Sequence, residues 1–105
     1  MTHHPLFTEI VTFAIPPHLT RAEIEAAYEA SAEHWRAHPA LIRKNYLLDS
    51  VSGRGGGVYL WRSRQAAEEA HGAAFRARIQ ATFGATPEIT IYETPLIVDN
   101  APLPA

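Results

Sequence analysis

The segments Leu41–Asp49 (LIRKNYLLD) and Gly57–Arg62 (GVYLWR) decide the fold of this 105-residue chain. Each has the apolar and aromatic composition of a short β-strand. The segment between them, Ser50–Gly56 (SVSGRGG), holds three of the chain's six glycines. Two strand-like runs joined by a glycine-rich connection predict a β-hairpin with a flexible loop.

Helical patterns lie on either side of this hairpin. Thr20 and Glu23 have the spacing of a capping box and predict the start of a helix that extends toward Pro39. Ser63 is a typical N-cap for a second helical segment, which covers 64–71, breaks at Gly72 and resumes over 73–83. Apolar spacing of three and four gives the first helix one buried face, made of Ile24, Ala27, Tyr28, Ser31 and Trp35.

Strands are also expected near both ends of the chain. Leu6–Ile15 is rich in β-branched and aromatic residues and is closed by two prolines. Glu88–Val98 is the last expected strand, bent or ended at Pro95, and an extended tail over 99–105 follows it. The order β-α-β-β-α-β predicts one α+β domain over 1–105 with a ferredoxin-like fold, a four-stranded antiparallel sheet with its helices on one face.

Composition and charge remove several classes of function. An apolar fraction of 47% and a charged fraction of 19% are those of a globular chain, and no apolar run is long enough to span a membrane. Nine basic residues, scattered among eleven acidic ones, argue against nucleic acid and charged membranes as partners. The absence of cysteine excludes disulfides and thiolate chemistry. Because Met1–Pro5 does not resemble a signal peptide, we expect a cytoplasmic protein that handles a small molecule, another protein, or both.

Large apolar residues alternate onto both faces of the expected sheet, although helices cover only one face. An exposed apolar face usually marks an interface, so we expect two sheets to stack in a homodimer. The alternative is a single sheet with some exposed aromatic residues. On the first strand Phe7, Val11 and Phe13 alternate with Leu6, Ile10 and Ala14, on the third Val58 and Leu60 alternate with Tyr59 and Trp61, and on the last Ile89 and Ile91 alternate with Tyr92 and Leu96.

The run Leu41–Leu48, followed by Gly55–Trp61 and an Ala/Glu-rich helix, resembles the mono-oxygenases of the YdhR-like type. The helix with Trp35 and the closing strand fit the same pattern, so the resemblance covers most of the chain. It implies membership of the dimeric α+β barrel superfamily, which includes quinol and anthrone oxygenases. The implied activity is oxidation of a small phenolic, quinol or anthrone-like aromatic by O2 without a cofactor. Other superfamily members leave two alternatives open, a haem-binding relative and a non-catalytic small-ligand-binding or stress-related dimeric protein.

Two histidines on the first helix are candidates for chemistry. His34 and His38 are spaced i, i+4, but no third ligand is evident, so no metal site is predicted. His38 continues the apolar stripe beyond Trp35, and a neutral imidazole at the edge of an apolar cavity is a plausible proton acceptor. The alternative is a histidine that packs at the helix end and bonds a nearby carbonyl.

Four aromatic residues, Trp35, Tyr46, Tyr59 and Trp61, suit a pocket that binds a planar hydroxylated ring. They would equally suit a core or a dimer interface. Lys44 shares one strand face with Tyr46. If that face coincides with the face of Tyr59 and Trp61, Lys44 lies beside an aromatic cavity and stabilises a phenolate or enolate, with His38 or Tyr46 as the base. Otherwise Lys44 is a solvated charge on an edge strand.

Overall fold

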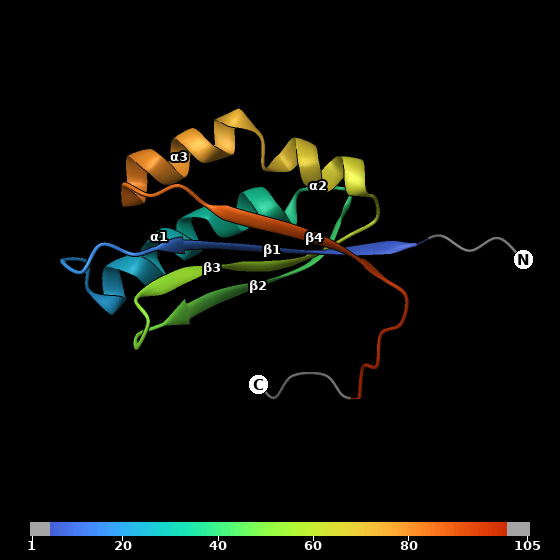
Figure 1. Cartoon of the computed structure of the whole chain (residues 1–105), viewed down its shortest axis with the longest axis horizontal. Coiled ribbons are helices and arrows are strands. Elements are labelled where there is room, and N and C mark those ends of the chain that lie inside the picture. The colour runs from blue at the N-terminus through green and yellow to red at the C-terminus, as the bar shows by residue number, and fades with distance from the viewer. Residues whose placement is uncertain (1–4, 101–105) are drawn as a thin grey trace, which may run out of the picture.

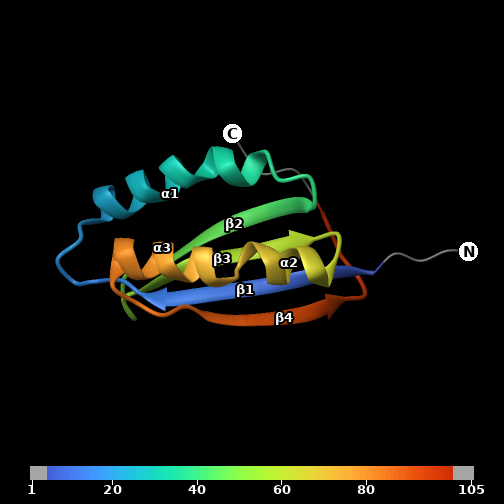
Figure 2. The ribbon, with the colours of Figure 1, turned by 90° about the horizontal axis from the view of Figure 1, so that it is seen from above.

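The computed structural model describes residues 5–100. Its four strands form one antiparallel sheet in the order β2-β3-β1-β4. Three helices lie on the same side of the sheet, α1 alongside the edge strand β2 and α2 and α3 over the strands in the middle (Figures 1 and 2). This confirms the ferredoxin-like α+β fold. The elements are β1 Leu6–Ala14, α1 Arg21–Arg36, β2 Leu41–Asp49, β3 Arg54–Trp61, α2 Arg64–Ala70, α3 Ala73–Phe83 and β4 Glu88–Thr94.

Local signals set most of the element ends. The capping box is confirmed: Oγ1 of Thr20 accepts a hydrogen bond from the Glu23 amide at 3.1 Å, and Oε1 of Glu23 accepts one from the Thr20 amide at 2.9 Å. The break at Gly72 separates α2 from α3. β4 ends at Thr94, because the following Pro95 cannot donate to the sheet. Of the predicted extended tail, residues 101–105 lie outside the described residues.

The start of β3 differs from the prediction. Residues 54–56 were expected in the loop, yet β3 begins at Arg54, and Gly55 and Gly56 are paired with β1 and buried. Gly56 has φ +147°, and a Cβ there would overlap the carbonyl oxygen of Val11 on the neighbouring strand. The glycines therefore serve close packing inside the sheet rather than loop flexibility.

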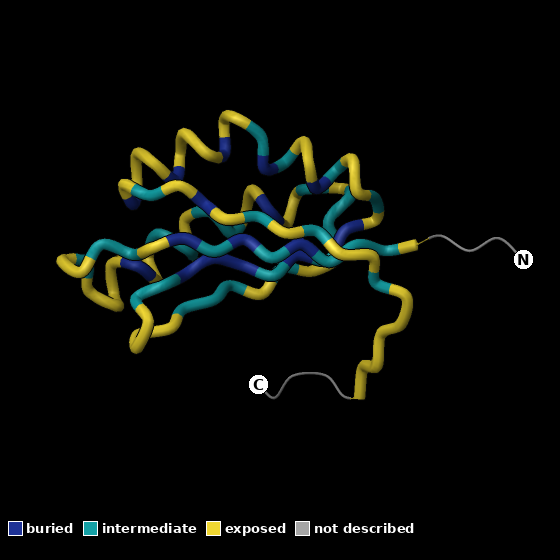
Figure 3. Tube along the Cα trace, viewed as in Figure 1, coloured by how far each residue is buried: buried dark blue, intermediate teal, exposed yellow. Residues whose placement is uncertain are grey.

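The core lies between the sheet and the helices, as the buried stretches in Figure 3 show. Alternate residues of β1 and β3 face it, and the helices add aromatic and aliphatic side chains. The opposite face of the sheet is open: Ile10, Val58 and Leu60 are half-buried there, and Tyr92 is 55% exposed. The buried core consists of Val11, Phe13, Trp35, Tyr59, Trp61, Ala67, Phe75, Ile79 and Phe83.

Within residues 5–100, no helix combines the length and the apolar character that crossing a membrane requires.

Candidate functional site

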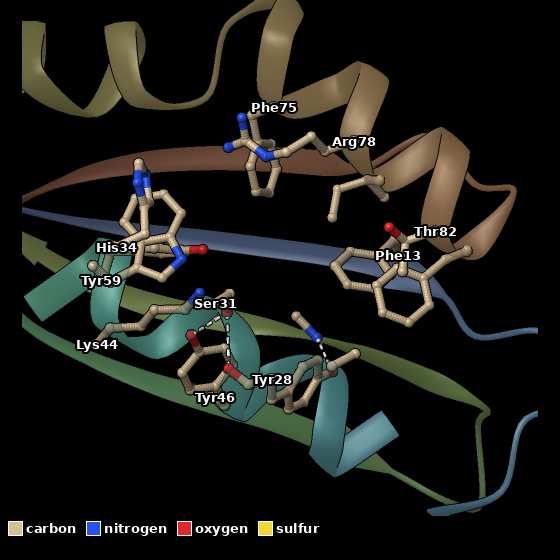
Figure 4. A pocket seen from close by; sticks show the side chains of 15 residues that line it. Phe13, Tyr28, Ser31, His34, Lys44, Tyr46, Tyr59, Phe75, Arg78 and Thr82 are labelled. Carbon is tan, nitrogen blue, oxygen red and sulfur yellow. Dashed lines mark hydrogen bonds between the residues drawn. The ribbon is translucent and has the colours of Figure 1, made fainter. Parts of the chain in front are cut away.

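A cavity of about 380 Å³ lies between α1, α3 and the helix-covered face of the sheet (Figure 4). Its volume falls in the range of small-molecule binding sites. Most of its wall is apolar or aromatic, with a few hydroxyl groups and basic side chains. The lining residues are Phe13, Ala27, Tyr28, Ser31, His34, Trp35, Lys44, Tyr46, Gly56, Tyr59, Phe75, Arg78, Ile79, Thr82 and Phe83.

Lys44 lies at the floor of this cavity. In the register of β2 and β3 it is opposite Tyr59, so both side chains project from the same face of the sheet. Its Nζ is 3.8 Å from the ring centre of Tyr46, 4.5 Å from that of Trp35 and 4.6 Å from that of Tyr59. The faces of the second and third strands thus coincide, which is the condition under which the sequence places Lys44 beside an aromatic cavity.

The aromatic surroundings change the acid–base properties of two cavity groups. Burial lowers the pKa of the Lys44 amine to about 7, because few water molecules remain to solvate the ammonium form. Burial also raises the pKa of the Tyr59 hydroxyl, and the nearby Glu9 adds to that rise. Near neutral pH, Lys44 therefore exists in both protonation states, while Tyr59 stays a neutral phenol.

Hydroxyl groups on α1 and β2 along one wall are held by hydrogen bonds to the backbone and to each other. The Tyr28 hydroxyl donates to the Leu47 carbonyl at 2.8 Å and accepts from the Gly56 amide at 3.1 Å. Ser31 Oγ donates to the Tyr28 carbonyl at 2.9 Å and lies 2.5 Å from the Tyr46 hydroxyl. Because the single proton of Ser31 is directed to that carbonyl, the Tyr46 hydroxyl is the donor in its bond to Ser31.

Two of the predicted site residues, His38 and Trp61, do not line the cavity. His38 lies beyond the end of α1, where its Nδ1 accepts a hydrogen bond from the Ala40 amide at 3.2 Å and its ring packs edge-on against Trp61 at 4.9 Å. Trp61 is fully buried in the core. The cavity instead includes His34, which the sequence suggested only as a metal ligand with His38.

A buried polar cluster that the sequence did not predict lies behind the cavity wall. Oε1 of Glu9 accepts a hydrogen bond from Trp61 Nε1 at 2.9 Å and lies 2.7 Å from Nδ1 of His71. Glu9 and His71 are both buried, and the His71 ring stacks on Trp35 at 5.4 Å. The sequence did contain a sign of this buried carboxylate, because Glu9 falls between Phe7 and Val11 on the strand face assigned to apolar residues.

The contribution of α3 to the site was also missed. Arg78 and Thr82 of this helix line the cavity together with its apolar residues. They lie on the partly polar flank of a helix whose spacing indicated only an apolar stripe. In the described part of the chain, no group of three His, Asp or Glu side chains is placed to share a metal ion.

The fold matches that of known structures. No protein-family model and no curated protein sequence matches the chain. Solved structures do match, and they show that the chain has the ferredoxin-like α+β fold of antibiotic biosynthesis monooxygenases.

Three of these structures illustrate the likeness. A protein of unknown function from Nitrosomonas europaea has a TM-score of 0.71 at 15% identity, with 99% of each chain covered. SnoaB, a cofactor-independent oxygenase from Streptomyces nogalater, has a TM-score of 0.66 at 16% identity over 90% of this chain and 97% of its own. A monooxygenase from the ActVA-Orf6 gene of Streptomyces coelicolor, in complex with nanaomycin D, has a TM-score of 0.65 at 19% identity over 97% and 95%.

Proposed function

We propose that this protein is a cofactor-independent mono-oxygenase that acts on a small phenolic, quinol or anthrone-like aromatic. The observation that carries the proposal is the Lys44 amine, held among three aromatic rings in a cavity of ligand size. Supporting it, SnoaB is a cofactor-independent oxygenase of the same fold, and the Streptomyces coelicolor monooxygenase is bound to nanaomycin D. The finer YdhR-like assignment rests on the sequence resemblance.

In this proposal Lys44 is the base. Its pKa of about 7 leaves a large fraction of the amine neutral at neutral pH, able to take the proton of a bound ring hydroxyl or activated carbon. The resulting ammonium then stays beside the substrate anion and stabilises it. His38 is not given this role because it does not line the cavity, and Tyr46 is not because its hydroxyl proton is already donated to Ser31.

The anion is the electron donor to O2. One electron passes to O2, and the substrate radical and superoxide then combine to form a carbon–oxygen bond. The peroxide anion that results takes back the proton from the Lys44 ammonium and becomes a hydroperoxide. Its O–O bond then breaks, the hydrogen on the same carbon leaves as a proton and joins the departing hydroxide as water, and the other oxygen atom remains as a carbonyl. Anthrone and O2 would thus give anthraquinone and water. The apolar wall favours this step because it keeps water away from the anion.

The test is O2 consumption with anthrone, measured against pH and corrected for the buffer rate. We expect the catalysed rate to rise as pH increases through about 7, because the neutral amine is the active form. Lys44→Met should lower the rate about 100-fold, the scale of a positioned base. Lys44→Arg should lose a similar factor, because a guanidinium keeps the charge but does not release its proton at neutral pH.

His38→Gln is the matched control, since it changes an ionisable residue outside the cavity and should leave the rate within about twofold. A rate that falls above pH 7, together with an active Lys44→Arg variant, would contradict the role of Lys44 as base and favour its role as a fixed cation. No turnover above buffer across anthrones and hydroquinones, with ligand binding intact, would favour the non-catalytic binding protein instead.

We also propose that the chain forms a homodimer through the open face of its sheet. The support is the apolar character of that face, where half-buried Ile10, Val58 and Leu60 adjoin the exposed Tyr92. A second copy would remove these side chains from water.

A further inference from the structure

The cavity lining has the opposite charge balance to the chain as a whole. The chain carries eleven acidic and nine basic residues, for a formal charge of −2. None of the fifteen described residues that line the cavity is acidic, while Lys44, Arg78 and His34 are basic. A cavity that contains cationic groups without a carboxylate is electrostatically suited to an anionic ligand.

Arg78 is the permanent charge in this set. It projects from α3 over the cavity, with its guanidinium 5.8 Å from the centre of the Phe75 ring (Figure 4). The residue is exposed, so it lies where a ligand enters, and its positive charge opposes the rise that burial causes in the pKa of Tyr59. The influence on Tyr59 indicates that the charge of Arg78 reaches the interior of the cavity.

Arg78 has no carboxylate partner among residues 5–100, a property that it shares with Arg62, Arg64 and Arg76. Four arginines elsewhere lie within 4 Å of an acidic side chain, namely Arg21, Arg36, Arg43 and Arg54. The planar fork of a guanidinium binds a carboxylate through two parallel hydrogen bonds, and in Arg78 that fork is available to a ligand.

We infer that the ligand of this cavity is an aromatic acid, whose carboxylate binds Arg78 at the entrance while its ring lies among the aromatic residues and its hydroxyl faces Lys44 at the floor. Arg78 then determines specificity and orientation. It distinguishes acids from neutral aromatics and directs the reacting end of the ring toward Lys44. The inference rests on the proposed function only in that the ligand occupies this cavity, and it does not require that oxidation follows.

The test compares two ligands that differ in one group, 6-hydroxy-2-naphthoate and 6-hydroxy-2-naphthamide, by calorimetric titration at pH 7.5. The wild-type protein should bind the acid about tenfold more tightly than the amide, the scale of one charge-assisted hydrogen-bonded pair. Arg78→Gln should remove this difference by weakening the acid about tenfold and leaving the amide unchanged. Arg78→Lys should retain part of the preference, because it keeps the charge and loses the fork.

Arg76→Gln is the matched control, since Arg76 is exposed on the same helix and does not line the cavity. It removes the same net charge and should change neither affinity. Equal binding of the acid and the amide by the wild type, no binding of the acid, or an equal effect of Arg76→Gln would each overturn the inference. Acid binding that depends on Arg78 without any O2 consumption would uphold it and count against the oxygenase proposal alone.

Discussion

At the scale of single residues, Lys44 combines two requirements that usually exclude each other. It is removed far enough from water for its pKa to fall to about 7, yet the faces of Trp35, Tyr46 and Tyr59 surround the amine and attract its ammonium form. The two effects oppose each other, and neither protonation state is strongly disfavoured. A group that changes charge near neutral pH is suited both to take a proton and to hold the anion that remains.

Removal of the buried Glu9 side chain should destabilise the fold. Glu9→Ala leaves Trp61 Nε1 without its acceptor and His71 without its carboxylate, all within a buried core. We expect the free energy of unfolding to fall by about 3 kcal/mol, the lower end of the cost of breaking a buried pair. Urea unfolding followed by tryptophan emission measures the loss. Glu9→Gln is the matched variant and should lose less, because its amide oxygen still accepts from Trp61, whereas wild-type stability of Glu9→Ala would contradict the interpretation.

At the scale of the elements, the features that depend on nearby residues were predictable and the others were not. The capping box at Thr20, the break at Gly72 and the end of β4 before Pro95 all follow from neighbouring residues. The start of β3 was not predictable, because what requires Gly56 is the Val11 carbonyl on a strand distant in sequence. The glycine content was visible, but its reason lies in the tertiary packing.

The candidate site divides in the same way. Alternation along β2 and β3 correctly grouped Lys44 with Tyr46 and Tyr59 with Trp61, but only the register between the strands shows that these faces coincide. His38 and Trp61 were grouped with the pocket by periodicity, although α1 ends at Arg36 and Trp61 lies deeper in the core. The cavity residues on α3 could not be predicted, because their position depends on how this helix packs across the sheet, and a single sequence does not show that.

The glycines of β3 provide a contrast that tests this packing. Alanine at Gly56 would overlap backbone atoms of Val11 and would also be strained at φ +147°, so we expect a loss of 3 kcal/mol or more, on the order of a severe core substitution. Alanine at Gly57 would instead place its Cβ 2.9 Å from Cε of Lys44, the far end of a flexible side chain, and 3.1 Å from Cε1 of Tyr59, so that side chains rather than backbone must shift. Gly57→Ala should therefore fold with a loss of at most about 1 kcal/mol and should displace the Lys44 amine from its aromatic site.

Thermal unfolding and the pH profile of O2 consumption distinguish the two glycine variants. Gly57→Ala should remain folded but lose the rise in rate through pH 7, since the displaced amine regains water and its ordinary pKa. Comparable stability of the two variants would show that β3 does not pack against β1 in the way described. If Gly57→Ala kept the wild-type pH profile, the position and pKa of the Lys44 amine would not depend on the absence of a side chain at Gly57.

At the scale of the whole molecule, the two faces of the sheet are treated differently. The helices cover one face, and the cavity lies between them and the sheet, whereas within residues 5–100 the other face meets only the segment that follows β4 (Figure 1). That segment reaches from one edge strand to the other, because Asp99 lies 3.7 Å from Arg43 of β2. It leaves Leu96 and Val98 more than three-quarters exposed. The apolar surface of the open face therefore extends beyond the strands.

Dimer formation through the open face predicts that one charge placed there will separate the copies. Tyr92 is 55% exposed and pairs with Thr8, whose partner on the other neighbouring strand is Leu60. Tyr92→Glu should therefore cost a single chain little, but in the dimer it would bury carboxylates between the two sheets. At a protein concentration of about 10 µM, a dimer with an interface of standard size stays associated. In sedimentation equilibrium at that concentration, the wild type should have twice the mass of the 11.6 kDa chain, and Tyr92→Glu should have the mass of one chain. Gln80→Glu adds the same charge to the exposed side of α3 and should leave the dimer intact. A wild-type protein that sediments as one chain would remove the dimer proposal.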